Sequence, residues 1–257
     1  MNGIGDFLQW LACLILYSPI EPDEIDTELN TINEKQQFVP ILDSCGGPNA
    51  LTANFTNANV GRIRGQAFGC GNFVQNKRGV IGADFAYLSG IAGGDILTGI
   101  EYEFRARVAA RGRMRHFPAE TPGGSPPFGR NPAPFTIGLV FTFIRIFQVN
   151  DAGDLFEIAR SPQIFHHSVT HPASAGVILP APFDLNEEVS LRFTPINDGP
   201  VFFEVEVSVQ GGATGSFSDI QIGSFEDATS GFATVEVSAP IAQKVLEDDA
   251  CAELFGR

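Results

Sequence analysis

Apolar and polar residues alternate along this chain with no long amphipathic helix between the alternating runs, and that pattern limits the fold more than any other feature. From Ile100 to Val108 every second residue is apolar, and Glu or Arg residues stand between. The same period of two returns at 189–193, 203–209 and 233–237. It is typical of strands with one buried face. Turns rich in Gly, Asn and Asp separate the runs, so the sequence predicts an all-β, antiparallel β-sandwich of jelly-roll type.

The predicted sandwich occupies residues 51–239, and a different kind of segment stands at each end. Residues 1–50 combine a short amphipathic helix with an extended arm rich in proline and acidic residues. Residues 240–257 are predicted as a short C-terminal helix, because proline suits the first helical position and an apolar side follows it. A chain of 257 residues can bury such a core without covalent cross-links.

Charge and aromatic content narrow the range of partners. The net charge of −14 argues against nucleic acid, since phosphate binding needs a basic surface. Residues 51–116 are nevertheless basic, with nine bases and four acids, while both flanking regions are acidic. The acidic arm and the basic middle could therefore pair within one subunit or between subunits. The 23 Phe against 3 Tyr and 1 Trp favour a large core over a sugar-stacking surface.

Two apolar stretches predict contact with a partner. The apolar stripe of the N-terminal helix has three alternative covers: its own domain, another subunit or a membrane surface. The segment 135–147 is apolar on both faces, as in a strand covered on both sides. The second apolar face of this strand would be covered by the N-terminal helix, the C-terminal helix or another subunit. The predicted interface residues are Ile4, Phe7, Leu8, Leu11, Ile15, Val140, Ile144 and Ile146.

Targeting, cysteine and metal signals are weak. Asp6 is the only charge before the apolar run at 7–16, and Pro19 closes that run early, so neither a cleaved signal peptide nor a transmembrane span is predicted. Cys45 and Cys70 lie in glycine-flanked turns and are either bridged or free thiols. At most two of the three clustered histidines, at 166–171, would share a strand face, so no metal site is predicted.

Glu24, Asp26 and Glu28 are the one candidate catalytic group. On a regular strand these three carboxylates would line one face, as glycoside hydrolysis by paired carboxylates requires. The string resembles the E-x-D-x-E strand of laminarinase-type glycoside hydrolases, which are also β-sandwiches. In that family the strand lies deep within the sandwich, whereas here it follows Pro22 in a charged arm. Hydrolysis is therefore a remote alternative, and we expect a protein that is not an enzyme.

A second resemblance is carried by residues 98–108 and by 217–222, the phrase FSDIQI. The first resembles a strand that opens the sheet of jelly-roll carbohydrate-binding modules of families 4 and 9, and the second resembles their closing phrase. Related jelly rolls recur in tailed-phage virion proteins. The resemblance covers about half of the chain and implies the same fold, with a structural calcium as the only cofactor to consider. Sugar-stacking residues cannot be carried over, because Tyr102 is the only Trp or Tyr in 99–225.

Together these features predict a non-enzymatic structural protein of a virus-like particle, such as a capsid decoration, spike or tail component. It would be made in the cytoplasm, reside in the virion, and bind copies of itself or another particle protein. The alternative is a carbohydrate-binding module that recognises a cell-surface glycan through the Pro/Gly-rich loop at 118–134 and its basic flank. The candidate glycan-binding residues are Arg113, Arg115, His116, Phe128 and Arg130.

Overall fold

The computed structural model describes Leu11, Cys13 and residues 17–37, 49–69, 77–118, 135–172, 179–214, 218–223 and 231–245. Within these residues twelve strands form two sheets, and every pairing between strands is antiparallel. The prediction of an all-β, antiparallel sandwich is confirmed. No helix in the described part of the chain has the length and apolar character needed to span a membrane.

Sheet I holds six strands in the order β1-β4-β10-β6-β7, and β8 also pairs with β6. Their bounds are β1 (Asp23–Gln37), β4 (Lys77–Ile91), β10 (Val201–Thr214), β6 (Phe135–Val149), β7 (Leu155–Arg160) and β8 (Ile164–Pro172). Sheet II has the order β11-β3-β12-β5-β9, with β2 on the outer side of β3 and a further β11–β5 pairing. Its bounds are β2 (Ala50–Asn57), β3 (Val60–Gly69), β11 (Ser218–Gly223), β12 (Ala233–Lys244), β5 (Tyr102–Pro118) and β9 (Leu179–Phe193).

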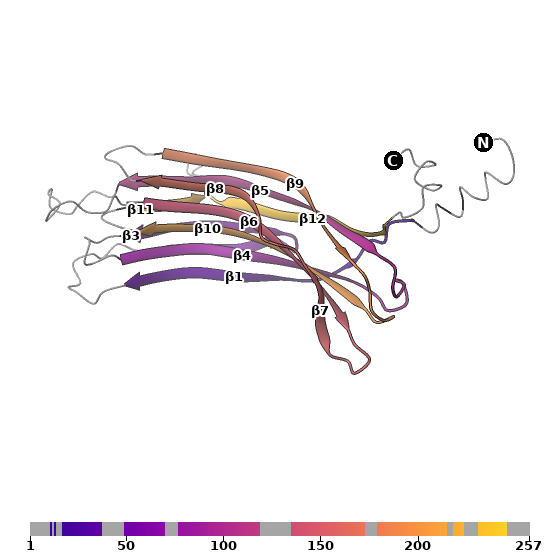
Figure 1. Ribbon diagram of the computed structural model, residues 1–257. Helices are drawn as coiled ribbons and strands as arrows, with labels where there is room; N and C mark the ends of the chain where they lie inside the picture. Colours follow the sequence, from indigo (N-terminus) through magenta and orange to yellow (C-terminus); the bar gives the residue numbers. More distant parts are fainter. Residues whose placement is uncertain are drawn as a thin grey trace, which may run out of the picture.

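The strand order is that of a jelly roll. The chain crosses from β3 to β4, from β4 to β5 and from β5 to β6, and each crossing changes the sheet. It crosses again from β8 to β9 and from β9 to β10. The result sets β4-β10-β6-β8 opposite β3-β12-β5-β9, the double-sheet arrangement of a jelly roll. Figure 1 shows most of the strands running side by side along one direction, with the β6–β7 hairpin at one end.

The core fills the space between the two sheets. On β10 the alternate residues Val201, Phe203, Val205, Val207 and Val209 have no exposed surface. The alternate positions of β5, from Tyr102 to Met114, face them from sheet II and are equally buried. Burying every second side chain removes the apolar surface from water while the intervening polar residues stay solvated.

Segment 23–37 is a strand of the sandwich and not an extended arm. It forms β1, which pairs with β4 along almost its whole length at the edge of sheet I. Leu29 packs against the core, whereas the acidic residues that suggested an arm lie on an exposed edge. Charged residues are common on edge strands because they discourage pairing with other chains.

The helix predicted from Pro240 is wrong for the part that the structure describes. Strand β12 continues to Lys244, and its register shifts between Ser238 and Ile241. Pro240 thus sits in a bulge, one of the few strand sites that tolerate a residue without an N–H. Beyond the bulge, Ala242 and Ile20 exchange two backbone hydrogen bonds of 2.8 Å. Residues 246–257 lie outside the described residues.

The predicted interface is also corrected on β6. Val140, Ile144 and Ile146 were expected to meet a partner, but they have no exposed surface and belong to the molecule's own core. The opposite face of β6 is the one turned outward. Of the N-terminal stripe, Leu11 is half-buried, whereas Ile4, Phe7, Leu8 and Ile15 lie outside the described residues.

Candidate functional site: two outer sheet faces

The outer surface of sheet II is rich in arginine, and we call it the arginine face. On β5 the inward positions carry core residues such as Phe104, so the arginines between them point outward. The register aligns β3, β12 and β9 with β5, which brings arginines from three parts of the sequence together, β3, β5 and β9. The charged residues of this face are Arg62, Arg64, Arg105, Arg107, Arg111, Arg113, Arg115 and Arg192, with Glu101, Glu103, Asp184, Glu188 and Glu236.

Only some of these arginines are neutralised within the chain. Arg105 donates to Glu103 over 2.8 Å, and Arg111 pairs with Asp184 over 3.2 Å. By contrast, Arg107 donates to a neutral acceptor, the side-chain oxygen of Asn186, over 2.6 Å. Neither Arg107 nor the exposed Arg64 has a carboxylate partner among the described residues. The face therefore keeps an excess of positive charge.

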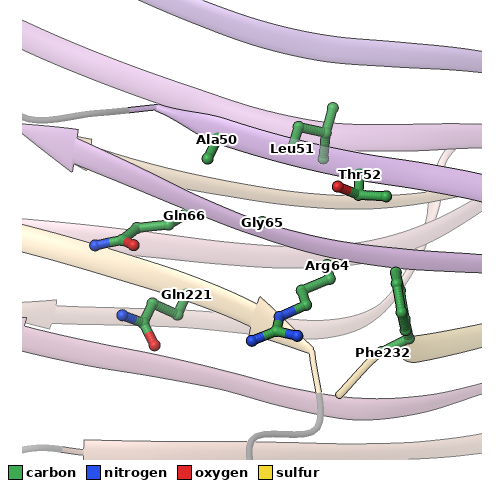
Figure 2. A pocket seen from close by; sticks show the side chains of 8 residues that line it. All are labelled: Ala50, Leu51, Thr52, Arg64, Gly65, Gln66, Gln221 and Phe232. Carbon is green, nitrogen blue, oxygen red and sulfur yellow. The ribbon is translucent and has the colours of Figure 1, made fainter. Parts of the chain in front are cut away.

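Two shallow hollows lie on the arginine face. The first, of about 410 Å³, opens over β2, β3 and β11 (Figure 2). In the figure the Arg64 side chain extends between Gln221 and Phe232, and Gln66 lies farther along the same hollow. The second, of about 380 Å³, is lined by residues of β5, β9 and β12 that include Arg111 and Asp184. Guanidinium and amide donors beside an aromatic ring suit hydroxylated or anionic groups.

The outer surface of sheet I has the opposite character, and we call it the acidic–aromatic face. Carboxylates stand on β1, β4 and β10, and apolar side chains stand on β6 and β8. Among the residues whose side chains the structure describes, only two arginines interrupt them. The face includes Asp26, Glu28, Glu34, Asp84, Glu157, Glu204, Glu206, Ile137, Leu139, Phe141, Phe143, Phe147, Phe165, Phe202, Arg145 and Arg160.

Arg145 joins the acidic and aromatic halves of this face. Its Nε donates to Glu204 over 3.0 Å, and its guanidinium lies 3.8 Å from Glu206. The same guanidinium lies over the rings of Phe143 and Phe147, at 5.6 and 5.7 Å from their centroids. Arginine is suited to this double role because its planar cation both pairs with carboxylates and stacks on aromatic rings.

The surroundings of Glu206, on β10 of this face, disfavour its charged form. Burial raises its pKa above the usual 4.5, and the nearby charges of Asp84 and Glu204 add to the rise, which Arg145 partly offsets. Asp84 in turn accepts a hydrogen bond from the Ser208 hydroxyl. The folded protein therefore binds a proton at Glu206 more readily than the unfolded chain does.

This raised pKa predicts a pH effect on stability. As the pH rises from about 4.5 through the folded-state pKa of Glu206, the folded state should lose stability relative to the unfolded chain. Glu206→Gln should therefore be more stable than the wild type at neutral pH, and the difference should shrink as the pH falls toward 4.5. Urea midpoints across this range measure the effect. Glu28→Gln, an exposed glutamate on the same face, controls for net charge, and a constant difference between Glu206→Gln and the wild type would contradict the expectation.

The residues predicted to bind a glycan are only partly described. Arg113 and Arg115 lie half-buried on the arginine face, each with an interaction of its own. The side chain of His116, together with Phe128 and Arg130, lies outside the described residues. The predicted glycan-binding residues did not include Arg64, Gln66, Gln221 or Phe232, which form the polar and aromatic lining of the first hollow. The available signal was the alternation of Arg62 and Arg64 with small or apolar residues.

Glu24, Asp26 and Glu28 do not line one face as predicted. A bulge between Glu24 and Asp26 shifts the register, so Asp26 and Glu28 point outward while Glu24 pairs opposite the buried Ser89. On that side, burial and then the charge of Glu24 raise the pKa of Tyr87. The geometry that made hydrolysis by these three carboxylates an alternative is therefore absent.

Two of the clustered histidines, His166 and His167, contact β9 of the opposite sheet. Nε2 of His166 lies 2.7 Å from the Thr142 hydroxyl, and Nδ1 lies 3.1 Å from Glu187 on β9, so this ring links the two sheets. His167 packs near Phe183, and burial lowers its pKa. Within the described ranges no group of three or more His, Cys, Asp or Glu side chains is placed to hold a metal ion. Cys13 is disulfide-bonded; Cys45 and Cys70 lie outside the described residues.

Comparison with known proteins does not identify a family. No family model and no curated protein matches this chain. A tailspike protein domain of bacteriophage CBA120 is similar at 8% identity and a TM-score of 0.25, over 86% of this chain and 19% of that one. A carbohydrate-binding module of the β-sandwich superfamily is similar at 7% identity and a TM-score of 0.23, over 76% of this chain and 54% of that one. The xylan-binding module CBM22-1 from Paenibacillus barcinonensis Xyn10C is similar at 7% identity and a TM-score of 0.20, over 85% of this chain and 97% of that one.

The chain thus spans about a fifth of the tailspike domain and about half of the first carbohydrate-binding module. These TM-scores are too low to establish a common fold. The jelly-roll assignment rests on the observed strand order.

Proposed function

We propose that this protein is a non-enzymatic structural subunit that associates with copies of itself, as a component of a virus-like particle. The observation that carries the proposal is the apolar half of the acidic–aromatic face. Phe165 is 57% exposed, and its ring packs only 5.7 Å from that of Phe141. Leu139, Phe143 and Phe147 continue the same surface and are half-exposed. A contiguous apolar patch rimmed by polar residues is typical of a protein–protein contact.

Size-exclusion chromatography with light scattering on the full chain tests this proposal. The wild type should elute above the monomer mass of 27.6 kDa, and Phe165→Ser should shift it toward the monomer. Ile196→Ser is the matched control, because Ile196 is 60% exposed but lies outside the patch. A wild type that stays monomeric at every concentration would overturn the proposal. So would equal association of Phe165→Ser and the wild type.

Carbohydrate recognition is a second candidate, favoured by the first hollow of the arginine face. Amide and guanidinium donors next to the Phe232 ring could hold the hydroxyl and carboxylate groups of an acidic glycan. On a glycan array, any binding to uronic-acid polymers should fall about tenfold in Phe232→Ala, a loss typical of one stacked ring. Ile196→Ala is the control, and absence of binding by the wild type would remove this candidate.

A further inference from the structure

The two outer faces carry opposite charge on opposite sides of the same sandwich. Among the residues whose side chains the structure describes, the arginine face has eight arginines and five carboxylates, and the acidic–aromatic face has seven carboxylates and two arginines. Because the sheets are stacked, the faces point away from each other and cannot meet within one molecule. A second copy can bring them together.

We infer that copies of this chain associate head to tail, with the arginine face of one copy seated on the acidic–aromatic face of the next. The inference rests on the proposed function and specifies its geometry. Joining two different surfaces makes a heterologous contact, which leaves one face free at each end. Such a contact propagates into a ring or an open filament and does not stop at a two-fold dimer.

The unpaired charges of the two faces complement each other. On the arginine face Arg62, Arg64 and Arg107 have no carboxylate partner among the described residues. On the acidic–aromatic face the carboxylates of Asp26, Glu28 and Asp84 form no ion pair with a basic side chain among the described residues. Complementary potentials of this kind orient partners and disfavour contacts between like faces. Two acidic–aromatic faces would repel each other.

The aromatic half of the face also suits arginine. Within the chain, Arg145 and Arg160 already stack over Phe143, at 5.6 and 5.4 Å from its centroid. Phe165 is more exposed and carries no such cation among the described residues. An arginine from a second copy would find there the same ring surface that the chain's own arginines use.

The size of the faces is sufficient for a stable contact. Five strands about 4.8 Å apart, each rising about 3.3 Å per residue over the 14 residues of β10, cover roughly 24 by 46 Å, or about 1,100 Å². A standard protein–protein interface buries about 800 Å² on each partner. Burial of most of one face would therefore supply the area of a standard interface.

Charge reversal tests the geometry. Arg64→Glu with Arg107→Glu changes only the arginine face, and Asp26→Arg with Glu28→Arg changes only the acidic–aromatic face; all four side chains are exposed. Each double variant alone should weaken association by about tenfold or more, as measured by light scattering. An equimolar mixture of the two should regain the wild-type mass, because every contact in an alternating chain is again between opposite charges. Asp95→Arg with Asp151→Arg, in exposed turns, reverses as many charges off both faces and should leave the mass unchanged.

The outcomes separate this inference from the proposed function. If the wild type associates and Arg64→Glu with Arg107→Glu associates equally well, the head-to-tail geometry is wrong while self-association stands. If the mixture fails to regain mass although each variant keeps its circular dichroism spectrum, the pairing of these two faces is also wrong. If the wild type is a monomer throughout, the proposed function itself fails.

Discussion

Replacing Phe203 with alanine is expected to lower the free energy of unfolding by about 3–5 kcal/mol. Phe203 has no exposed surface. Its ring stacks on Phe104 with centroids 4.4 Å apart and meets Phe193 edge-on at 5.5 Å. It thereby joins β10 of sheet I to β5 and β9 of sheet II. Alanine would lose the transfer free energy of the ring and leave a cavity that a β-sandwich core closes only in part. Urea unfolding of the purified chain measures the loss.

The neighbouring residue provides the control for this substitution. Phe202 carries the same side chain on the same strand but points outward and is half-exposed. Phe202→Ala should therefore cost clearly less than Phe203→Ala. Equal losses would mean that β10 is shifted by one residue from its register with β4, because a one-residue shift exchanges the two faces of a strand.

The fold was predictable because the period of two is local and strong. The alternating segments at 100–108, 189–193, 203–209 and 233–237 all lie in or overlap strands of the sandwich. Their order in the sheets was not readable, since antiparallel neighbours such as β4 and β10 lie more than a hundred residues apart. The one terminal helix that could be compared failed at Pro240, because a sequence pattern cannot distinguish a helix start from a proline accommodated in a bulge.

The basic character of the candidate site could be predicted from the sequence, but its position on the fold could not. Five outward positions of β5 carry arginine, which indicates a basic outer face, and residues 51–116 carry an excess of bases. The first hollow could not be foreseen, because Arg64 and Gln221 meet only through the pairing of β3 with β11. For β6 the two apolar faces were recognised, but which face looks inward depends on the whole sandwich, so Val140 was assigned to the wrong environment.

Gly61→Ala is the second substitution with a large expected effect, a loss of about 1–3 kcal/mol from overpacking. A methyl group at Gly61 on β3 would lie 1.9 Å from Cε1 of Phe85, a core residue of the opposite sheet. The Phe85 ring cannot retreat easily, because it packs edge-on against Phe55 with centroids 5.7 Å apart. Gly212→Ala is the control, since its nearest neighbours would be 3.7 and 4.0 Å away, and it should be neutral or slightly stabilising.

A double-mutant cycle shows whether the Phe85 ring is the cause of that loss. Phe85→Leu alone should destabilise the protein by removing ring atoms from the core. In the double variant the new methyl group of Gly61→Ala occupies part of the space that the ring has left. The combined loss should therefore be smaller than the sum of the single losses by about 0.5–3 kcal/mol. Additive losses, or a Gly61→Ala variant as stable as Gly212→Ala, would show that β3 and β4 do not approach each other as closely at this point as the structure places them.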